Sequence, residues 1–428
     1  MPVHSHPARW RPGAIPRGLL LLLVGSWLFA SGAGAQPIHG YHLFRNRKKV
    51  VVPFELHSNL IIVPIRINNS DTLNFILDTG VSVTLVTDPK VGRSLGLVPV
   101  RKVKIAGAGS QGELTASVTL GATVRMHDIR ADNIPLLILS EDILALSDYI
   151  GIPIHGVFGY DLFNRFVVNI DFEAKLVTFT LPERHRYRRA REGTKLPITI
   201  ENTKPYLTAM AIVEDGKSVP IKVIVDTGAG HALSLDLGSH QQIHLPDKVV
   251  RSQLGRGLSG VINGSLGRLG RVKIGDFTLD NVVTSYPDST SLYPNPARDG
   301  NRQGNLGCEM LRRFRVTFNY QDGYLALRPI RKRLKESFEH DMSGLELRAR
   351  GANYRNYMIE RVQSDSPAAA AGLMAGDEIM FFNGEPVREM PMNDIYKLLQ
   401  KKEGKEIKLM VKRDNELIYT TFILRRII

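Results

Sequence analysis

The chain is poor in cysteine, with Cys308 as the one thiol among 428 residues. A single thiol excludes an internal disulfide, so a hydrophobic core must stabilise the fold, and the hydrophobic content of 43% is ordinary for a soluble globular protein. Cys308 itself is interpreted as a small buried residue. We found no nucleic-acid-binding motif and, after the first 35 residues, no apolar run long enough to cross a bilayer. The length therefore indicates a globular protein of two or three domains.

The first 35 residues have the pattern of an export signal. Arginines precede an apolar run at 18–30, and Ala33-Gly34-Ala35 offers small residues for cleavage before Gln36. No cysteine follows the run, which argues against a lipoprotein anchor. We therefore expect residues 1–35 to be a signal peptide and the mature chain to be periplasmic or secreted from a bacterium. The alternative is an uncleaved membrane anchor.

Two Asp-Thr-Gly triplets mark an internal repeat in the chain. Asp78-Thr79-Gly80 follows the apolar run 74–77, and Asp226-Thr227-Gly228 follows the run 222–225. The triplets lie 148 positions apart, and other residues recur at the same offset. These pairs are Gly107 and Gly255, Gly109 and Gly257, Gly112 and Gly260, Gly156 and Gly304, Gly159 and Gly307, and Phe166 and Phe314. One structural unit therefore occurs twice, and each copy carries one aspartate after a buried strand.

Two equivalent carboxylates meeting across a pseudo-twofold axis can activate one water molecule. Carboxylates about 3 Å apart cannot both ionise, so the pair shares one proton. The ionised member takes a proton from water, and the protonated member donates a hydrogen bond to a carbonyl oxygen. Gly80 and Gly228 allow a close approach, and the hydroxyls of Thr79 and Thr227 can brace the two loops. Which aspartate holds the proton does not follow from the sequence, because the pair titrates as a unit.

The sequences FILDTGV and VIVDTGA resemble the motif of the aspartic peptidases. The second signature of that family, two apolar residues and a glycine, is present as Val157-Phe158-Gly159, whereas the other copy reads Asn305-Leu306-Gly307 and departs from it at Asn305. Val81 and Ala229 after the triplets are similar to the retropepsin-like branch, which implies a less acidic pH optimum. The resemblance covers residues 50–330, implies Asp78 and Asp226 as the catalytic pair and implies no metal or organic cofactor.

Glycine-rich segments lie about 27 positions after each triplet, where the family has its substrate-covering flap. They contain Gly107, Gly109 and Gly112 in the first copy and Gly255, Gly257 and Gly260 in the second. Glycine suits a mobile hairpin that approaches a peptide backbone, so these residues are candidates for flap and substrate contacts. A plain flexible loop is the alternative, and neither segment contains an obvious flap tyrosine.

The formal net charge of +14 is concentrated in two basic segments, 183–195 and 331–340. Both are predicted to be solvated linkers, and a weak contact with an anionic surface is a further possibility. His231 follows the second triplet, but a lone histidine is more often structural than catalytic.

The C-terminal residues 341–428 resemble a PDZ domain of the bacterial protease type. The match rests on Ser366-Pro367-Ala368, Ala371-Gly372-Leu373 and Gly376-Asp377-Glu378-Ile379, followed by a predicted helix from Met392. In that family the loop Gly344-Leu345-Glu346-Leu347 would hold the carboxylate of a C-terminal peptide ligand by strand addition. Glu346 replaces a small residue, which puts this capture in doubt and leaves a structural module that packs on the catalytic lobes as the alternative.

The fold class is therefore predicted to be mainly β, a duplicated bilobal aspartic-peptidase β-barrel fold followed by a small α+β PDZ domain. The lobes are assigned to residues 36–182 and 196–330, since short alternating runs recur there at a spacing typical of strands. The predicted strands include Leu60–Ile67, Leu114–Leu120, Phe166–Ile170, Leu176–Thr180, Leu207–Val213, Leu269–Ile274, Phe314–Phe318 and Tyr324–Leu327. Because one chain holds both lobes, catalysis requires no dimer.

These features predict an exported aspartic endopeptidase that acts on polypeptide substrates. A non-catalytic extracytoplasmic peptide-binding protein of the same fold is the alternative, supported by Asn305 and the missing flap tyrosine. A processing enzyme that removes its own basic segment at 36–50 is a second alternative.

Overall fold

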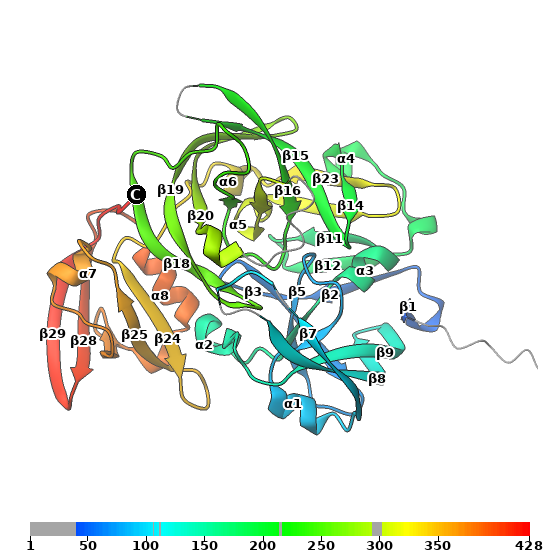
Figure 1. The fold of residues 1–428 in the computed structure, drawn as a ribbon, viewed down its shortest axis with the longest axis horizontal. Helices are drawn as coiled ribbons and strands as arrows, with labels where there is room; N and C mark the ends of the chain where they lie inside the picture. Colours follow the sequence, from blue (N-terminus) through cyan, green and yellow to red (C-terminus); the bar gives the residue numbers. More distant parts are fainter. Residues whose placement is uncertain (1–39, 106, 111–112, 214–215, 293–301) are drawn as a thin grey trace, which may run out of the picture. The chain divides into compact units, whose positions relative to one another are not determined.

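The computed structural model describes residues 40–428 except 106, 111–112, 214–215 and 293–301 (Figure 1). The predicted signal peptide and Gly112 therefore lie outside the described residues. Strands dominate the described part of the chain and form four sheets, one for each copy of the repeat, one shared by the two copies, and one near the C-terminus. No helix in this part is both long and apolar enough to span a membrane.

The first copy forms a sheet around the strand that leads to Asp78. Its order is β1-β9-β6-β10-β5-β4-β8-β7, with β3 paired to β4. The strands are β1 (Gly40–Leu43), β3 (Glu55–His57), β4 (Leu60–Ile67), β5 (Leu73–Leu77), β6 (Leu85–Val86), β7 (Pro99–Ile105), β8 (Leu114–Met126), β9 (Ile129–Leu139) and β10 (Gly156–Phe158). β5 and β10 run parallel, with Ile76 opposite Val157. This pairing places the end of β5, and with it Asp78, beside the second family signature.

The second copy repeats this sheet. Its order is β14-β15-β16-β21-β17-β20-β19-β18. The strands are β14 (Thr199–Glu201), β15 (Lys204–Ile212), β16 (Ser218–Val225), β17 (Leu233–Leu235), β18 (Val249–Gly257), β19 (Gly260–Ile274), β20 (Phe277–Pro287) and β21 (Gly304–Leu306). Here β16 and β21 run parallel, with Ile224 opposite Asn305. The register matches that of the first copy, so Val157 and Asn305 occupy equivalent positions.

A third sheet joins the two copies, in the order β13-β23-β22-β11-β12-β2. Its strands are β2 (Lys49–Pro53), β11 (Val167–Asp171), β12 (Leu176–Thr180), β13 (Thr194–Pro197), β22 (Phe314–Asn319) and β23 (Tyr324–Pro329). At its centre Asn169 lies opposite Thr317, its own equivalent 148 positions later, and donates a hydrogen bond to the threonine hydroxyl at 2.8 Å. The pseudo-twofold axis therefore passes between β11 and β22.

The helices are short. They are α1 (Pro89–Ser94), α2 (Leu146–Ile150), α3 (Tyr160–Arg165), α4 (Arg189–Glu192), α5 (Cys308–Leu311), α6 (Arg331–Leu334), α7 (Pro367–Ala370) and α8 (Met392–Leu399). α3 and α5 begin directly after Gly159 and Gly307, at equivalent points of the repeat. Each of these glycines lies against backbone of a triplet loop, since a Cβ on Gly159 would lie 1.7 Å from the Asp78 carbonyl oxygen.

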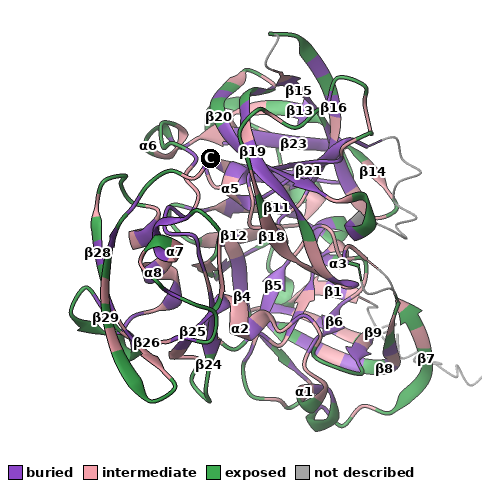
Figure 2. Cartoon of the chain, turned by 60° about the vertical axis from the view of Figure 1, so that its left-hand side comes forward, coloured by how far each residue is buried: buried purple, intermediate pink, exposed green. Residues whose placement is uncertain are grey.

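The C-terminal domain has its own sheet and its own core (Figures 1 and 2). The sheet order is β24-β25-β26-β28-β29, with β27 paired to β26. The strands are β24 (Leu345–Arg350), β25 (Asn356–Val362), β26 (Glu378–Phe382), β27 (Glu385–Pro386), β28 (Glu406–Arg413) and β29 (Glu416–Ile423). The apolar side chains of α8 at Ile395 and Leu399 are buried in this core, as their helical spacing predicts. The strand β24 lies at the edge of the sheet.

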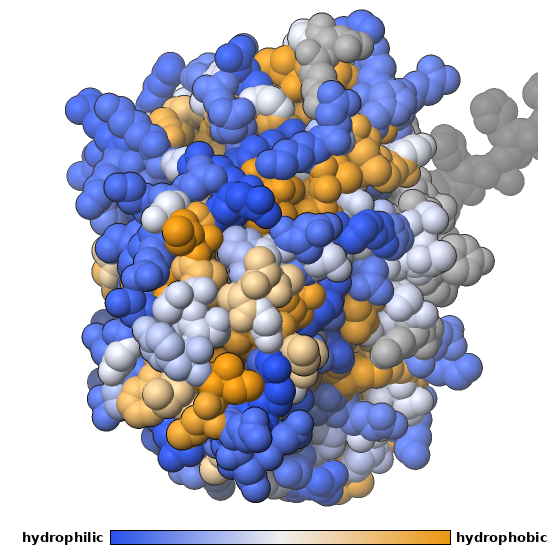
Figure 3. Space-filling model, turned by 90° about the vertical axis from the view of Figure 1, so that its left-hand side faces the viewer, coloured by the Kyte–Doolittle hydropathy of each residue, from blue (hydrophilic) through white to orange (hydrophobic). Residues whose placement is uncertain are grey.

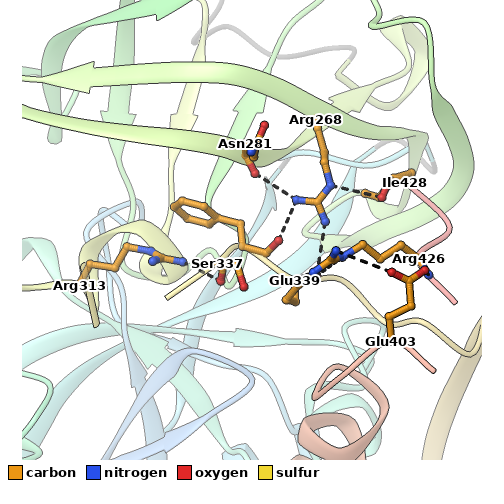
Figure 4. Close-up of polar contacts among 9 residues, drawn as sticks. Arg268, Asn281, Arg313, Ser337, Glu339, Glu403, Arg426 and Ile428 are labelled. Carbon is orange, nitrogen blue, oxygen red and sulfur yellow. Dashed lines mark hydrogen bonds and ion pairs between the residues drawn. The ribbon is translucent and has the colours of Figure 1, made fainter. Parts of the chain in front are cut away.

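Polar contacts connect this domain to the second copy through Arg268 of β19 (Figure 4). Its guanidinium donates hydrogen bonds to the carbonyl oxygens of Phe338 at 2.8 Å and Ile428 at 3.2 Å, and pairs with Glu339 at 3.5 Å. Glu339 also forms an ion pair with Arg426.

The face that carries β29 is mostly hydrophilic, with separate apolar patches (Figure 3).

Every strand predicted in the two copies is present, and β4 and β12 have the predicted bounds. The two basic segments are more ordered than solvated linkers. The first contains α4 and a 2.9 Å hydrogen bond between His185 and Tyr324, and all five arginines of this segment are exposed. The second contains α6, where Arg333 donates to the carbonyl oxygen of Phe172 at 3.2 Å. Within the 36–50 segment, β1 pairs with β9, and the first residues of β2, Lys49 and Val50, pair with β12.

Candidate active site

Asp78 and Asp226 leave the ends of two buried strands and face each other. Asp78 follows β5 and Asp226 follows β16, and their backbone N–H groups donate to the carbonyl oxygens of Phe158 at 2.9 Å and Leu306 at 2.8 Å. Each carboxylate accepts a hydrogen bond from the N–H of the glycine in its own triplet, Gly80 at 2.6 Å and Gly228 at 2.9 Å. Both aspartates remain partly exposed. The two predicted aspartates therefore lie close together, on equivalent loops of the two copies.

The threonines of the triplets cross-link the loops. The backbone N–H of Thr79 donates to the Thr227 hydroxyl at 3.0 Å, and the N–H of Thr227 donates to the Thr79 hydroxyl at 2.9 Å. Each hydroxyl in turn donates to a carbonyl oxygen of the other copy, Val225 for Thr79 and Leu77 for Thr227. Both threonines are 0% exposed. This closed set of buried hydrogen bonds fixes the position of one aspartate relative to the other.

The glycines of the triplets leave room for the carboxylates. A Cβ on Gly228 would lie 2.2 Å from Cγ of Asp78, which no real side chain tolerates. A Cβ on Gly80 would lie 3.0 Å from Oδ1 of Asp78 and 3.4 Å from Oδ1 of Asp226. The Asp78 carboxylate therefore rests directly on Gly228, and the close approach predicted from the sequence is present at both glycines.

Burial and the neighbouring carboxylate perturb the protonation of Asp78. Removal from water raises the pKa of Asp78 to about 8, and the charge of Asp226 adds to this effect. The hydrogen bond from Gly80 opposes the shift. The pair therefore holds one proton at neutral pH, as two closely spaced acids must.

Asn305 contacts the catalytic pair through its side chain, which the sequence indicated only as a departure from the family pattern. Its amide nitrogen lies 3.1 Å from Oδ2 of Asp226, and its amide oxygen lies 3.1 Å from Nη1 of Arg302. The sequence analysis missed Arg302 and the nearby Lys204, since neither belongs to a motif. Position in the repeat identifies Arg302, because it lies 148 positions after Ile154.

The two glycine-rich segments form hairpin tips that meet each other. β18 and β19 form the hairpin of the second copy, and its Ser259 N–H donates to the Ala108 carbonyl oxygen of the first at 2.9 Å. The Gly107 N–H donates to the Ser259 hydroxyl at 3.1 Å. A Cβ on Gly109 or on Gly257 would lie 2.2 Å from backbone of the opposite tip. Gly107, Gly109 and Gly257 therefore allow the tips to touch.

The other two flap glycines have different surroundings. Gly255 has φ of +153° and open space where a Cβ would lie, and Gly260 closes the β18–β19 turn with φ of +93°. A side chain at Gly255 would therefore meet no neighbour, and Gly260 supports the turn itself.

A cavity of about 700 Å³ extends from the second triplet loop to the C-terminal domain. Its lining includes Asn59, Gly230 and His231, Gln253 of β18, and Tyr396 and Lys397 of α8. Asn59 binds the Gly230 carbonyl oxygen at 2.9 Å and so connects the two copies here. His231 is half-buried, and loss of solvation lowers its pKa, so its imidazole is neutral at neutral pH.

Cys308 is buried, as expected, and its thiol donates to the Thr227 carbonyl oxygen at 3.3 Å. Nowhere in the described residues do three His, Cys, Asp or Glu side chains gather in a way that would hold a metal ion.

The loop predicted to hold a peptide carboxylate already has intramolecular partners. The backbone N–H groups of Ser343 and Gly344 donate to the carboxylate of Asp341, and the N–H of Leu345 donates to the Ser343 hydroxyl at 3.1 Å. On the edge strand β24, the N–H of Leu347 donates to the Tyr396 hydroxyl at 2.9 Å. The backbone N–H groups of Ser343, Gly344, Leu345 and Leu347 are thus already bonded within the protein.

Glu346 points away from this loop, toward Arg361 on β25 and toward the Ser252 hydroxyl on β18. The helix α2 of the first copy lies beside β24, where the Tyr149 hydroxyl accepts from Arg348 and, at 2.8 Å, from Arg256 of β18. The edge strand is therefore in contact with both copies of the repeat.

Comparison with protein families agrees with this geometry. A model of the aspartyl protease family matches residues 63–162 and again residues 209–310. A PDZ domain model matches residues 358–413, a stretch that begins after the loop at 344–347. No curated protein matched the chain in a sequence search.

Proposed function

Since the chain contains two retropepsin-like aspartyl protease regions followed by a C-terminal PDZ domain, we propose that it is an aspartic endopeptidase with Asp78 and Asp226 as its catalytic pair. The observation that carries this proposal is the facing of the two aspartates across a pseudo-twofold axis, held by reciprocal threonine hydrogen bonds. A protein that only bound peptides would have no use for two carboxylates forced so close together.

The proposed reaction is hydrolysis of a peptide bond by a water molecule between the two carboxylates. One carboxylate is ionised and accepts a proton from the water, while the other is protonated and polarises the scissile carbonyl group. The pKa of about 8 for Asp78 keeps one proton on the pair through neutral pH. We therefore expect activity that extends to neutral pH and is lost as this shared proton leaves, at around pH 8.

The flaps support an extended polypeptide as the substrate. Their tips connect one lobe to the other through Ala108 and Ser259, and we propose that a substrate chain lies between these tips and the catalytic pair. Opening of the tips would then admit the substrate, and closing would exclude water from the site.

We further propose that the PDZ domain acts by docking on the lobes, because the loop at 343–345 has internal partners and β24 contacts α2. We also propose that the protein acts outside the cytoplasm. This second proposal rests on the sequence pattern of residues 1–35.

Cleavage of a mixed peptide library by residues 36–428, measured from about pH 3 to 8 across the range in which carboxylate pairs titrate, tests the proposed function. Asp78→Asn serves as the matched control, because it keeps the size of the side chain. Cleavage that disappears in the variant supports the proposal and reports the substrate preference. A folded wild-type protein that cleaves nothing, or an active Asp78→Asn variant, would contradict it.

A further inference from the structure

The two catalytic aspartates stand against walls of opposite character. In the first lobe Leu60, Ile154 and Val157 belong to one apolar cluster beside β5 and β10. In the second lobe Arg302 and Asn305 lie 148 positions after Ile154 and Val157, and Lys204 begins the second strand of its hairpin as Leu60 does. The backbone registers of the lobes match, so the difference lies in the side chains alone.

Arg302 fixes the orientation of the Asn305 amide. A guanidinium only donates hydrogen bonds, so the atom of Asn305 that faces Arg302 Nη1 at 3.1 Å must be the oxygen. The amide nitrogen then faces Oδ2 of Asp226 at 3.1 Å and must donate to it. The Arg302 side chain is itself fixed in place, because it is only 7% exposed and its Nη2 forms an ion pair with Oδ2 of Asp236 at 3.8 Å. Val157 offers Asp78 no such donor.

The remaining titratable groups that face the pair do not oppose this difference. Burial lowers the pKa of His231 and raises the pKa of Cys308 and of Tyr320, so all three are neutral near neutral pH. The charge of Asp226 raises the pKa of Lys204 more than the charge of Asp78 does, although burial lowers that pKa overall. The described titratable groups that interact with the pair are therefore Lys204, His231, Cys308 and Tyr320; the cation among them, Lys204, belongs to the second lobe, and Arg302 reaches the pair through Asn305.

We propose that Asn305, oriented by Arg302, is a positioning residue that makes Asp226 the ionised base and leaves Asp78 as the protonated acid. The inference rests on the proposed peptidase function and assigns the two chemical roles within it. A donor at 3.1 Å stabilises the charged form of Asp226, whereas an apolar wall disfavours the charged form of Asp78.

The assignment gives a defined path for each proton. As the water oxygen bonds to the carbonyl carbon, Asp226 takes one proton from the water and Asp78 gives its proton to the carbonyl oxygen. The product is a tetrahedral diol with Asp226 protonated and Asp78 ionised. When the C–N bond breaks, Asp226 passes its proton to the amine nitrogen, and a diol hydroxyl returns a proton to Asp78 as the new carboxyl group forms.

Two reciprocal substitutions test the assignment, Asn305→Val and Val157→Asn. Each gives one lobe the side chain of the other at an equivalent position. The measurement is the pH dependence of kcat/KM, whose acidic limb reports ionisation of the base and whose basic limb reports loss of the proton from the acid. Loss of a hydrogen bond to a carboxylate corresponds to a shift of about one pH unit.

Asn305→Val should move the acidic limb up by about one pH unit and leave the basic limb in place. Val157→Asn should instead move the basic limb down, because the new donor would stabilise ionised Asp78. Asn305→Asp is isosteric with the wild-type side chain and keeps the test valid if the valine variant does not fold; a second acid there should move the acidic limb further up. An unchanged acidic limb in both Asn305 variants, or the same shift from Val157→Asn, would overturn the assignment.

A titration that needs no turnover separates this inference from the proposed function. NMR of protein labelled with ¹³C in the aspartate carboxyl groups follows each carboxylate directly, and the signals are assigned by loss in Asp78→Asn and Asp226→Asn. Asp78 should be the last of the pair to lose its proton in wild type, and the separation between the two signals should shrink in Asn305→Val. An inactive wild-type protein with this titration would contradict the peptidase proposal alone. A titration in which Asp78 ionises first would contradict the role of Asn305, whatever the activity.

Discussion

The two lobes present the same backbone to the catalytic pair and different side chains behind it. Each lobe delivers its aspartate from the end of a buried strand, fixed by the same register and by a threonine that reaches into the other lobe. Behind Asp78 the wall is apolar at Val157, and behind Asp226 it holds Asn305 and Arg302. The matched backbones bring the two carboxylates together, and the different side chains behind them give the aspartates the separate roles that we propose.

The glycines of the triplets should show the largest difference between the lobes outside the aspartates themselves. In Gly228→Ala the new Cβ would lie between 2.2 and 2.5 Å from three carboxylate atoms of Asp78, so the whole group must move. In Gly80→Ala the nearest atom is a single oxygen at 3.0 Å. A displacement of about 1 Å in a catalytic group can cost about 10²-fold, so kcat should fall by about that factor in Gly228→Ala and by about tenfold in Gly80→Ala. Equal losses in steady-state assays would contradict this reading of the packing.

The threonines should show no difference between the lobes. Thr79→Val and Thr227→Val each remove a hydroxyl that accepts one buried hydrogen bond and donates another. Unpaired buried groups are costly, so each variant should lower the free energy of unfolding by about 3 kcal/mol, measured by urea denaturation. A large difference between the two values would show that the cross-link is less symmetric than the structure indicates.

The flap tips should respond least. Gly109→Ala would place a Cβ 2.2 Å from Ser259 backbone, at a φ of +129° that favours glycine. Gly257→Ala would meet the Ala108 carbonyl oxygen at the same distance. Both variants should raise KM by a few-fold, to about 10-fold, with little change in the free energy of unfolding, and Gly109→Ala should have the larger effect. Unchanged KM values in both would show that contact between the tips has no part in substrate binding.

The sequence was sufficient for the features that repeat. The strands of both copies and the helix from Met392 follow the predicted runs, because alternating or helical spacing of apolar residues reflects burial directly. The aspartates, threonines and glycines of the triplets come together as predicted, because the buried strand before each triplet fixes the position of the loop that follows it.

Features that depend on contacts between distant segments were not predictable. Asn305 was visible as a departure from the family pattern, but its contact with Asp226 depends on Arg302, which no motif marks. The meeting of Ala108 with Ser259 and the filling of the loop at 343–345 by Asp341 likewise follow from tertiary packing. Spacing along the chain says nothing about either contact.

The measurement that tests the central claim most directly is a double-mutant cycle on Asp78→Asn and Asp226→Asn. If the lobes supply one acid–base unit, each single variant should lose about 10³-fold or more in kcat, and the double variant should lose no more than either single variant. Circular dichroism would confirm that all three variants are folded. Losses that multiply in the double variant, or substantial activity in either single variant, would contradict a shared catalytic pair.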